Sequence, residues 1–158
     1  MNTALSRFLA ACALGLAVHA AYAADNEPAP ATIDKLAAAR AQIAAKQWRV
    51  AIDELKKVND TGSADWNNLM GYSLRKAKVP DYEAAEKYYD EALRIDPQHR
   101  GALEYSGELY LMKGDLTKAE QRLSALDKIC RLPCEEYTDL KKAVQAYKSN
   151  GNKYVAAN

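Results

Sequence analysis

Two cysteines and one histidine are the side chains best suited to chemistry beyond the first 23 residues of this sequence. Cys130 and Cys134 stand four positions apart, and His99 lies shortly after a proline. Two cysteines this close favour a disulfide in an exported chain. The sequence lacks the C-x-x-C pair of a redox centre, and a zinc site could draw only on distant His99 for a further ligand. We therefore predict a Cys130–Cys134 disulfide, no metal and no cofactor, and we interpret His99 as a solvated loop residue.

The N-terminal segment 1–23 is typical of an export signal. Arg7 precedes the apolar run Phe8–Val18, and Ala21-Tyr22-Ala23 has small residues where a signal peptidase cleaves. The run is too short to span a bilayer, which takes about 20 residues. Cys12 lies in a stretch that resembles a lipoprotein cleavage box, but the apolar run continues beyond it. We therefore predict a cleaved signal peptide and a periplasmic location, in a Gram-negative bacterium.

Charge and motif content argue against several classes of function. The chain has 22 Lys and Arg against 21 Asp and Glu, and loss of Arg7 with the signal leaves 21 against 21. A balanced charge gives no reason to expect a nucleic-acid partner. Phosphate-binding loops and the signature motifs of hydrolases and metalloproteases do not occur in the sequence. We therefore expect a protein that is not an enzyme.

Apolar residues recur at helical spacing and predict an all-α fold. The clearest helix lies in 81–97, where Asp81 can cap the start and Pro97 ends it. A flexible linker at 24–31 precedes the helical domain 32–148, and a disordered tail at 149–158 follows it. The predicted helices are Ile33–Ala45, Trp48–Val58, Ser63 or Asp65 to Ala77, Asp81–Asp96, Gly101–Met112, Leu116–Ile129 and Glu135–Lys148.

A pattern in these helices repeats every 34 residues. Ala51, Ala85 and Ala119 are spaced by 34 and 34. Large or apolar residues recur at the same interval, in the sets Trp48/Tyr82/Leu116, Leu55/Tyr89/Leu123 and Val58/Ala92/Leu126. One helical hairpin cannot bury its apolar face alone, so hairpins with such a period stack on one another. The spacing predicts three hairpins at about 32–60, 63–97 and 99–131, and a capping helix at 134–148.

This pattern resembles the tetratricopeptide repeat family, whose loose signature is W-x2-L-G-x2-Y…A-x3-F…A…P. The second copy supplies Gly71, Leu74, Ala85, Tyr89, Ala92 and Pro97. The third supplies Leu103, Gly107, Tyr110, Ala119 and Leu123, whereas the first copy has no signature glycine or proline. The resemblance covers roughly 32–130 and implies a short α-solenoid of three helix-turn-helix repeats.

The resemblance also implies a concave groove that binds peptides and is lined by the first helix of each repeat. The residues that this register sends into the groove are Leu36, Arg40, Ile43, Asn68, Tyr72, Arg75, Glu104, Glu108 and Leu111. We expect Tyr72 and Arg75 to be the anchors, because aromatic and arginine side chains dominate many interfaces. The Lys/Asn/Arg set with which some members of the family hold a C-terminal carboxylate is not matched here.

The sequence therefore predicts a periplasmic protein that binds a protein or peptide partner through its groove, with no membrane span once the signal is removed. The alternative, from a different class, is a structural subunit that assembles through the ends of its solenoid in a complex of the cell envelope.

Overall fold

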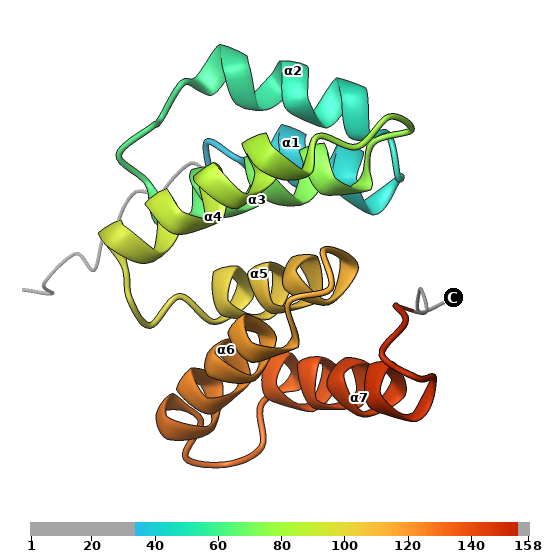
Figure 1. The fold of residues 1–158 in the computed structure, drawn as a ribbon. Coiled ribbons are helices and arrows are strands. Elements are labelled where there is room, and N and C mark those ends of the chain that lie inside the picture. Colours follow the sequence, from blue (N-terminus) through green and yellow to red (C-terminus); the bar gives the residue numbers. More distant parts are fainter. Residues whose placement is uncertain (1–33, 155–158) are drawn as a thin grey trace, which may run out of the picture. The chain divides into compact units, whose positions relative to one another are not determined.

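The computed structural model describes residues 34–154, and the predicted signal, the linker and the last four residues lie outside this part of the chain. Its helices are α1 (Ala37–Ala44), α2 (Trp48–Val58), α3 (Ala64–Lys76), α4 (Tyr82–Ile95), α5 (Arg100–Met112), α6 (Leu116–Ile129) and α7 (Glu135–Ser149) (Figure 1). No strand occurs among the described residues. The predicted all-α class is confirmed.

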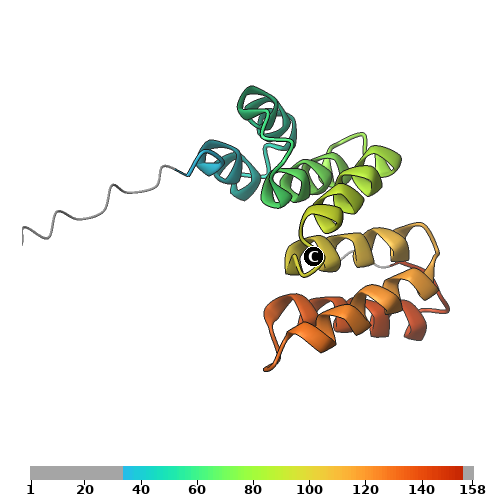
Figure 2. The same ribbon diagram turned by 90° about the vertical axis from the view of Figure 1, so that its left-hand side faces the viewer.

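The helices form three hairpins that are followed by α7. α1 packs on α2, α3 on α4, and α5 on α6, while α7 covers both α5 and α6. The first helices of the hairpins, together with α7, contact one another in succession, whereas the backbones of α2, α4 and α6 stay apart. Figure 2 shows the last hairpin and α7 packed side by side. This arrangement is the expected α-solenoid of helix-turn-helix units with a capping helix.

Small residues allow the two helices of a hairpin to approach closely. Ala51, Ala85 and Ala119, the three alanines at the 34-residue interval, are fully buried. In the second hairpin the ring of Tyr89 lies against Gly71, where an added β-carbon would come within 2.8 Å of the ring. Carbon atoms in contact prefer about 3.5 Å or more. The packing of α3 on α4 therefore depends on a glycine at position 71.

The helix boundaries lie within one residue of the prediction, except at the start of α1. α1 begins at Ala37 instead of Ile33, because the Asp34 carboxylate accepts a hydrogen bond from the Leu36 backbone N–H at 2.9 Å and holds a turn there. α3 ends at Lys76, one residue early. These shifts are local and leave the order of the hairpins unchanged.

The chain stays ordered beyond the predicted end of its last helix. α7 continues to Ser149, and Asn152, with a left-handed φ of 61°, donates its backbone N–H to the Tyr147 carbonyl at 3.0 Å. The half-buried ring of Tyr154 then packs against the core shared by α5, α6 and α7. The predicted disorder is therefore wrong for 149–154, because this ring anchors the segment.

His99 is a buried link between two hairpins, which corrects its interpretation as a solvated residue. Its side chain is 13% exposed, and its Nδ1 caps α5 by accepting the backbone N–H of Ala102 at 3.0 Å. An accepting Nδ1 carries no proton, so Nε2 donates to the Asp65 carboxylate at 2.9 Å. Burial acts to raise the pKa of Asp65, but the His99 hydrogen bond and the charge of Arg40 outweigh it and lower that pKa.

Candidate functional site

A pocket of about 310 Å³ lies between α3, α5 and the first turns of α7, and we call it the groove pocket. It is lined by Tyr72, Arg75, Lys76, Glu104, Tyr105, Glu108, Glu135, Glu136 and Asp139. The rings of Tyr72 and Tyr105 form an aromatic wall, with centres 4.5 Å apart. Five carboxylates stand against two cations in this lining, so the pocket is acidic.

Arg75 is sealed into the pocket wall, although the sequence suggested an exposed anchor. Its side chain is 1% exposed, and its Nη1 donates to Glu108 Oε2 at 2.7 Å. The guanidinium also lies 5.4 and 5.6 Å from the ring centres of Tyr72 and Tyr105, within cation–π range. Arg75 therefore holds α3, α5 and the aromatic wall together, and it is not available to a partner.

Glu104 is held in an unusual protonation state. Burial raises its pKa to about 8, and the charges of Glu108, Asp139 and Glu136 add to that rise, while Arg75 opposes it. Glu108 has the Arg75 guanidinium as its counter-ion, whereas Glu104 has no ion pair among the described residues. A cation placed beside Glu104 would favour its ionised form. The pocket thus has the chemistry to accept an ammonium or guanidinium group next to aromatic rings.

The residues predicted for the groove are divided between this pocket, its edge and the core. Those that line the pocket are Tyr72, Arg75, Glu104 and Glu108. Leu36 and Asn68 are 7% and 6% exposed, so they are buried and do not face a partner. Arg40 stays exposed and pairs with Asp65 at 3.0 Å. Both arginines of the predicted groove, Arg40 and Arg75, are therefore paired with acids.

Five residues of the pocket were missing from the prediction: Lys76 at the end of α3, Tyr105 in α5 and three residues of α7. Tyr105 follows Glu104 directly in α5, while Glu135, Glu136 and Asp139 lie in the first turns of α7. The sequence interpretation treated α7 only as a cap. The position of α7 in the chain could have indicated this role. α7 follows the third hairpin as the first helix of a fourth hairpin would, and it therefore extends the face formed by α3 and α5.

The comparison with known families agrees with this architecture. The tetratricopeptide repeat family matches residues 80–144, which run from just before α4 through most of α7. The chain is a tetratricopeptide repeat protein. No curated protein matches it. The first hairpin, which carries the weakest copy of the signature, lies outside the matched residues.

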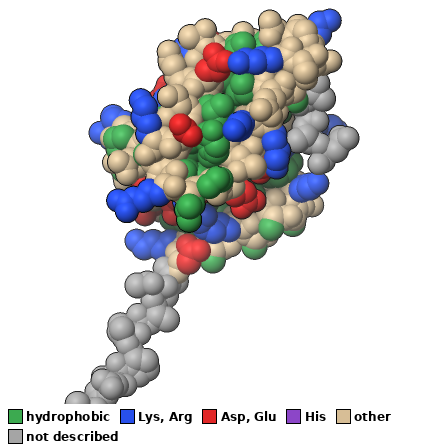
Figure 3. Space-filling model, turned by 90° about the horizontal axis from the view of Figure 1, so that it is seen from below, with side chains coloured by type: hydrophobic (Ala, Val, Ile, Leu, Met, Phe, Trp, Pro, Cys, Tyr) green, Lys and Arg blue, Asp and Glu red, His purple; other side chains and the backbone are tan. Residues whose placement is uncertain are grey.

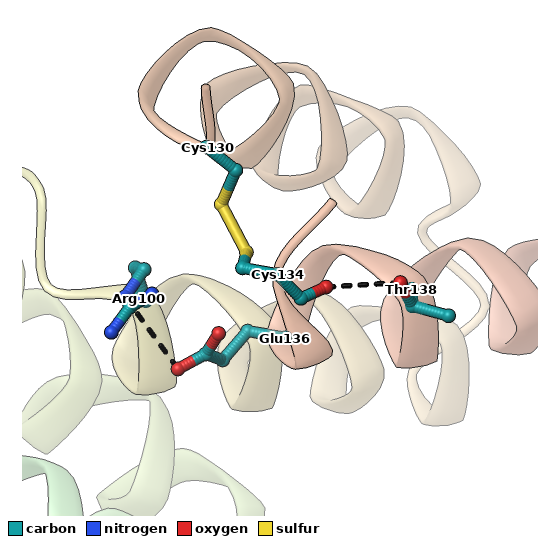
Figure 4. The surroundings of a disulfide bond; sticks show 5 residues. All are labelled: Arg100, Cys130, Cys134, Glu136 and Thr138. Carbon is teal, nitrogen blue, oxygen red and sulfur yellow. Dashed lines mark hydrogen bonds and ion pairs between the residues drawn. A yellow bond between two sulfur atoms is a disulfide. The ribbon is translucent and has the colours of Figure 1, made fainter. Parts of the chain in front are cut away.

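A disulfide positions α7 in this tetratricopeptide repeat protein (Figure 4). Cys130 ends α6 and Cys134 precedes α7, and the two are bonded as predicted, with their Cα atoms 5.8 Å apart. The Thr138 hydroxyl donates to the Cys134 carbonyl at 2.9 Å, and Glu136 Oε1 lies 3.6 Å from Arg100 Nε on α5. These contacts fix the turn that carries the α7 acids of the groove pocket.

The acids of the tetratricopeptide repeat protein do not converge as metal ligands would. Within residues 34–154, no group of three or more His, Cys, Asp or Glu side chains could hold a metal ion. None of the helices α1–α7 is long and apolar enough to cross a bilayer. Repeats of this family generally mediate protein–protein interactions. Protein binding is therefore the general role that the family indicates.

Proposed function

We propose that this protein is a non-enzymatic periplasmic scaffold, which binds a protein partner by taking a basic side chain of that partner into the groove pocket. The observation that carries the proposal is the pocket itself, where the Tyr72 and Tyr105 rings stand beside an excess of carboxylates. A lysine or arginine inserted there supplies the counter-charge that Glu104 lacks, and its cation contacts the faces of the two rings. Exposed acids at the pocket rim, such as Glu135, would add weaker attraction that salt screens.

The basic segment would bind in the manner known for peptides in grooves. A few anchors supply most of the affinity, and the surrounding contacts exclude water. Tyr72 is the anchor that the sequence and the pocket both indicate, whereas Arg75 acts by holding Tyr72 and Tyr105 in place. The specificity of the site for a basic side chain follows from its composition, because acidic side chains outnumber basic ones five to two in the lining and would repel an acidic partner.

Charge reversal at the pocket rim tests this proposal. In Glu135→Lys/Asp139→Lys both changes lie in α7, at side chains that line the pocket. The matched control, Asp53→Lys/Asp127→Lys, reverses two exposed acids outside it. Partners are captured from periplasmic extract, identified by mass spectrometry and titrated calorimetrically against each variant. We expect the groove variant to bind about tenfold more weakly, or 1.4 kcal/mol, with an unchanged circular dichroism spectrum. Equal affinity of wild type and groove variant would refute the proposal.

The periplasmic location rests on the signal pattern of 1–23 and on the disulfide, because disulfides persist in oxidising compartments. Cell fractionation followed by intact-mass measurement checks it. We expect the protein in the periplasmic fraction, with a mass that corresponds to a start at Ala24. A protein that retains Met1 and fractionates with the cytoplasm would contradict this location.

The second candidate function is assembly through the end of the solenoid, within a complex of the cell envelope. Figure 3 views this end and shows a strip of apolar side chains between charged ones. A shallow cavity of about 290 Å³ lies there between α6 and α7, with Leu123 and Tyr137 in its lining. Sedimentation velocity separates the two functions. Self-association that Tyr137→Lys abolishes and the groove variant preserves favours assembly.

A further inference from the structure

A second and larger groove lies between α2 and α4, on the side formed by the second helices of the hairpins. We call it the outer groove. Its volume is about 590 Å³, and it is lined by Lys56, Asn59, Thr61, Trp66, Asn67, Met70, Ala84, Lys87, Tyr88 and Glu91. α3 supplies the floor, where the rings of Trp66 and Tyr88 meet edge to face with centres 5.8 Å apart. The outer groove combines an apolar floor with lysines at its rim.

The equivalent position one repeat later is closed by the protein's own ion pairs. Between α4 and α6, Arg122 Nη2 lies 3.2 Å from Asp90 Oδ1, and Lys118 Nζ lies 3.6 Å from Glu86 Oε1. Both cations also stand over the ring of Tyr110, at 4.9 Å for Lys118 and 5.6 Å for Arg122. The cavity beside these two cations, which α5 and α6 line, has a volume of only about 140 Å³. Acids on one helix and cations on the next thus bridge this gap.

The 34-residue repeat explains why the outer groove stays open. Subtracting 34 places Lys56 where the next repeat has Asp90, and Tyr88 where it has Arg122. A lysine opposite a tyrosine cannot make the ion pair that an aspartate and an arginine make. The nearby acids are already occupied, since Glu91 pairs with Arg94 at 2.7 Å and Glu54 with Lys57 at 2.6 Å.

Two exposed lysines therefore flank the apolar floor without a counter-ion among the described residues. Lys56 belongs to α2 and Lys87 to α4, one on each side of the groove. In the neighbouring repeat a carboxylate of the protein itself, that of Asp90, pairs with the cation of Arg122. In the outer groove water solvates the two lysines, and a carboxylate of another molecule can pair with them.

We propose that the outer groove docks a segment of a protein partner in which a carboxylate side chain lies beside a large apolar side chain. The carboxylate pairs with Lys56 and Lys87, and the apolar side chain covers Met70 and Tyr88. This surface is separate from the groove pocket and opposite to it in charge preference, so one molecule could hold a basic and an acidic segment at once. Binding at the outer groove does not require binding at the groove pocket.

Selection of short random peptides on the mature protein tests the inference. The same selection is run on Lys56→Glu/Lys87→Glu, and on a matched control, Lys57→Glu, which alters the α2 lysine that lies outside the groove. We expect wild type and control to enrich peptides with Asp or Glu next to Phe, Leu or Trp. These peptides should bind the double variant about tenfold more weakly. Lys56→Gln/Lys87→Gln repeats the test if charge reversal prevents folding.

The two tryptophans locate the bound peptide. Trp66 lines the outer groove, whereas Trp48 packs against Tyr72 at a ring distance of 5.7 Å. In a two-dimensional NMR titration, an acidic peptide in the outer groove should shift the Trp66 indole signal and leave that of Trp48 in place. Enriched peptides without acids, equal affinity for the double variant, or no enrichment at all would overturn the proposal. So would binding to anionic lipid vesicles that the double variant abolishes while no peptide is enriched.

Discussion

Replacing Glu104 with glutamine should stabilise the protein in alkaline solution and leave its stability in acid unchanged. Glu104 lies in the groove pocket with a pKa raised to about 8, against an ordinary value of 4.5. Between these two pH values the folded state binds a proton that the unfolded state releases. Stability therefore falls as the pH rises from about 4.5 to about 8, and the loss is complete above that. Glutamine has the same shape and no charge, so the variant lacks this loss.

The size of the effect follows from the shift. Each tenfold difference in proton affinity corresponds to about 1.4 kcal/mol, so the full difference between 4.5 and about 8 amounts to roughly 5 kcal/mol at alkaline pH. Glu104 is only partly buried, and solvent screens part of this energy. Taking about half gives about 2 kcal/mol, which for a chain of this size is a rise in melting temperature of roughly 4–8 °C.

Urea denaturation of wild type, Glu104→Gln and Glu135→Gln across the pH range measures this difference. Glu135 is the matched control, because it belongs to the same pocket and is exposed. The unfolding free energies of wild type and Glu104→Gln should coincide near pH 4.5 and separate as the pH approaches 8, while the control follows wild type. Parallel curves for Glu104→Gln and wild type would refute the assignment of a buried, uncompensated carboxyl at this position.

Four further predictions test the packing and the links that position the groove pocket. Gly71→Ala should cost about 1–3 kcal/mol by overpacking against Tyr89, and an unchanged urea midpoint would contradict that contact. Arg75→Met should cost about 3 kcal/mol, because the Glu108 carboxylate loses its counter-ion. The exposed neighbour variant Lys76→Met should stay within about 0.5 kcal/mol of wild type, so equal losses would argue against the pair. His99→Ala should cost about 1 kcal/mol and speed hydrogen exchange at the Ala102 amide, whereas unchanged exchange there would rule out the cap. Cys130→Ser/Cys134→Ser should lower stability by about 2 kcal/mol, an effect that a reducing agent reproduces on wild type but not on the variant.

Most of the helices could be predicted because their signals are local. Asp81 was expected to cap α4, and it accepts the backbone N–H of Ala84 at 2.9 Å. Asp115 caps α6 in the same way, accepting the backbone N–H of Lys118 at 3.0 Å. The 34-residue interval then joined the helices into hairpins, and its alanines are buried as that packing requires. The later start of α1 was not predicted. There the Asp34 side chain accepts a hydrogen bond from the backbone, which competes with helix formation.

The candidate site was harder to predict, because it depends on pairs of residues far apart in the sequence. The helical register predicted an exposed anchor at Arg75. In the structure Glu108 on the next hairpin supplies its counter-charge, so the arginine can be buried. Sequence reasoning likewise placed His99 in a solvated loop, but Asp65 of the preceding hairpin accepts a hydrogen bond from its Nε2. Neither pairing leaves a signal in the periodicity of a single helix.

The sequence by itself determined the all-α class, the three stacked hairpins and the disulfide, since these follow from apolar spacing, from capping residues and from two cysteines that lie four positions apart. The tertiary structure decided which polar side chains face solvent and where the grooves lie. It brought the α7 acids beside Tyr72 and Tyr105 to make the groove pocket. It also left the outer groove open where Lys56 stands in place of an acid. The physical reason is that a charged side chain is buried or exposed according to the partner that packing places beside it, and that partner comes from another repeat.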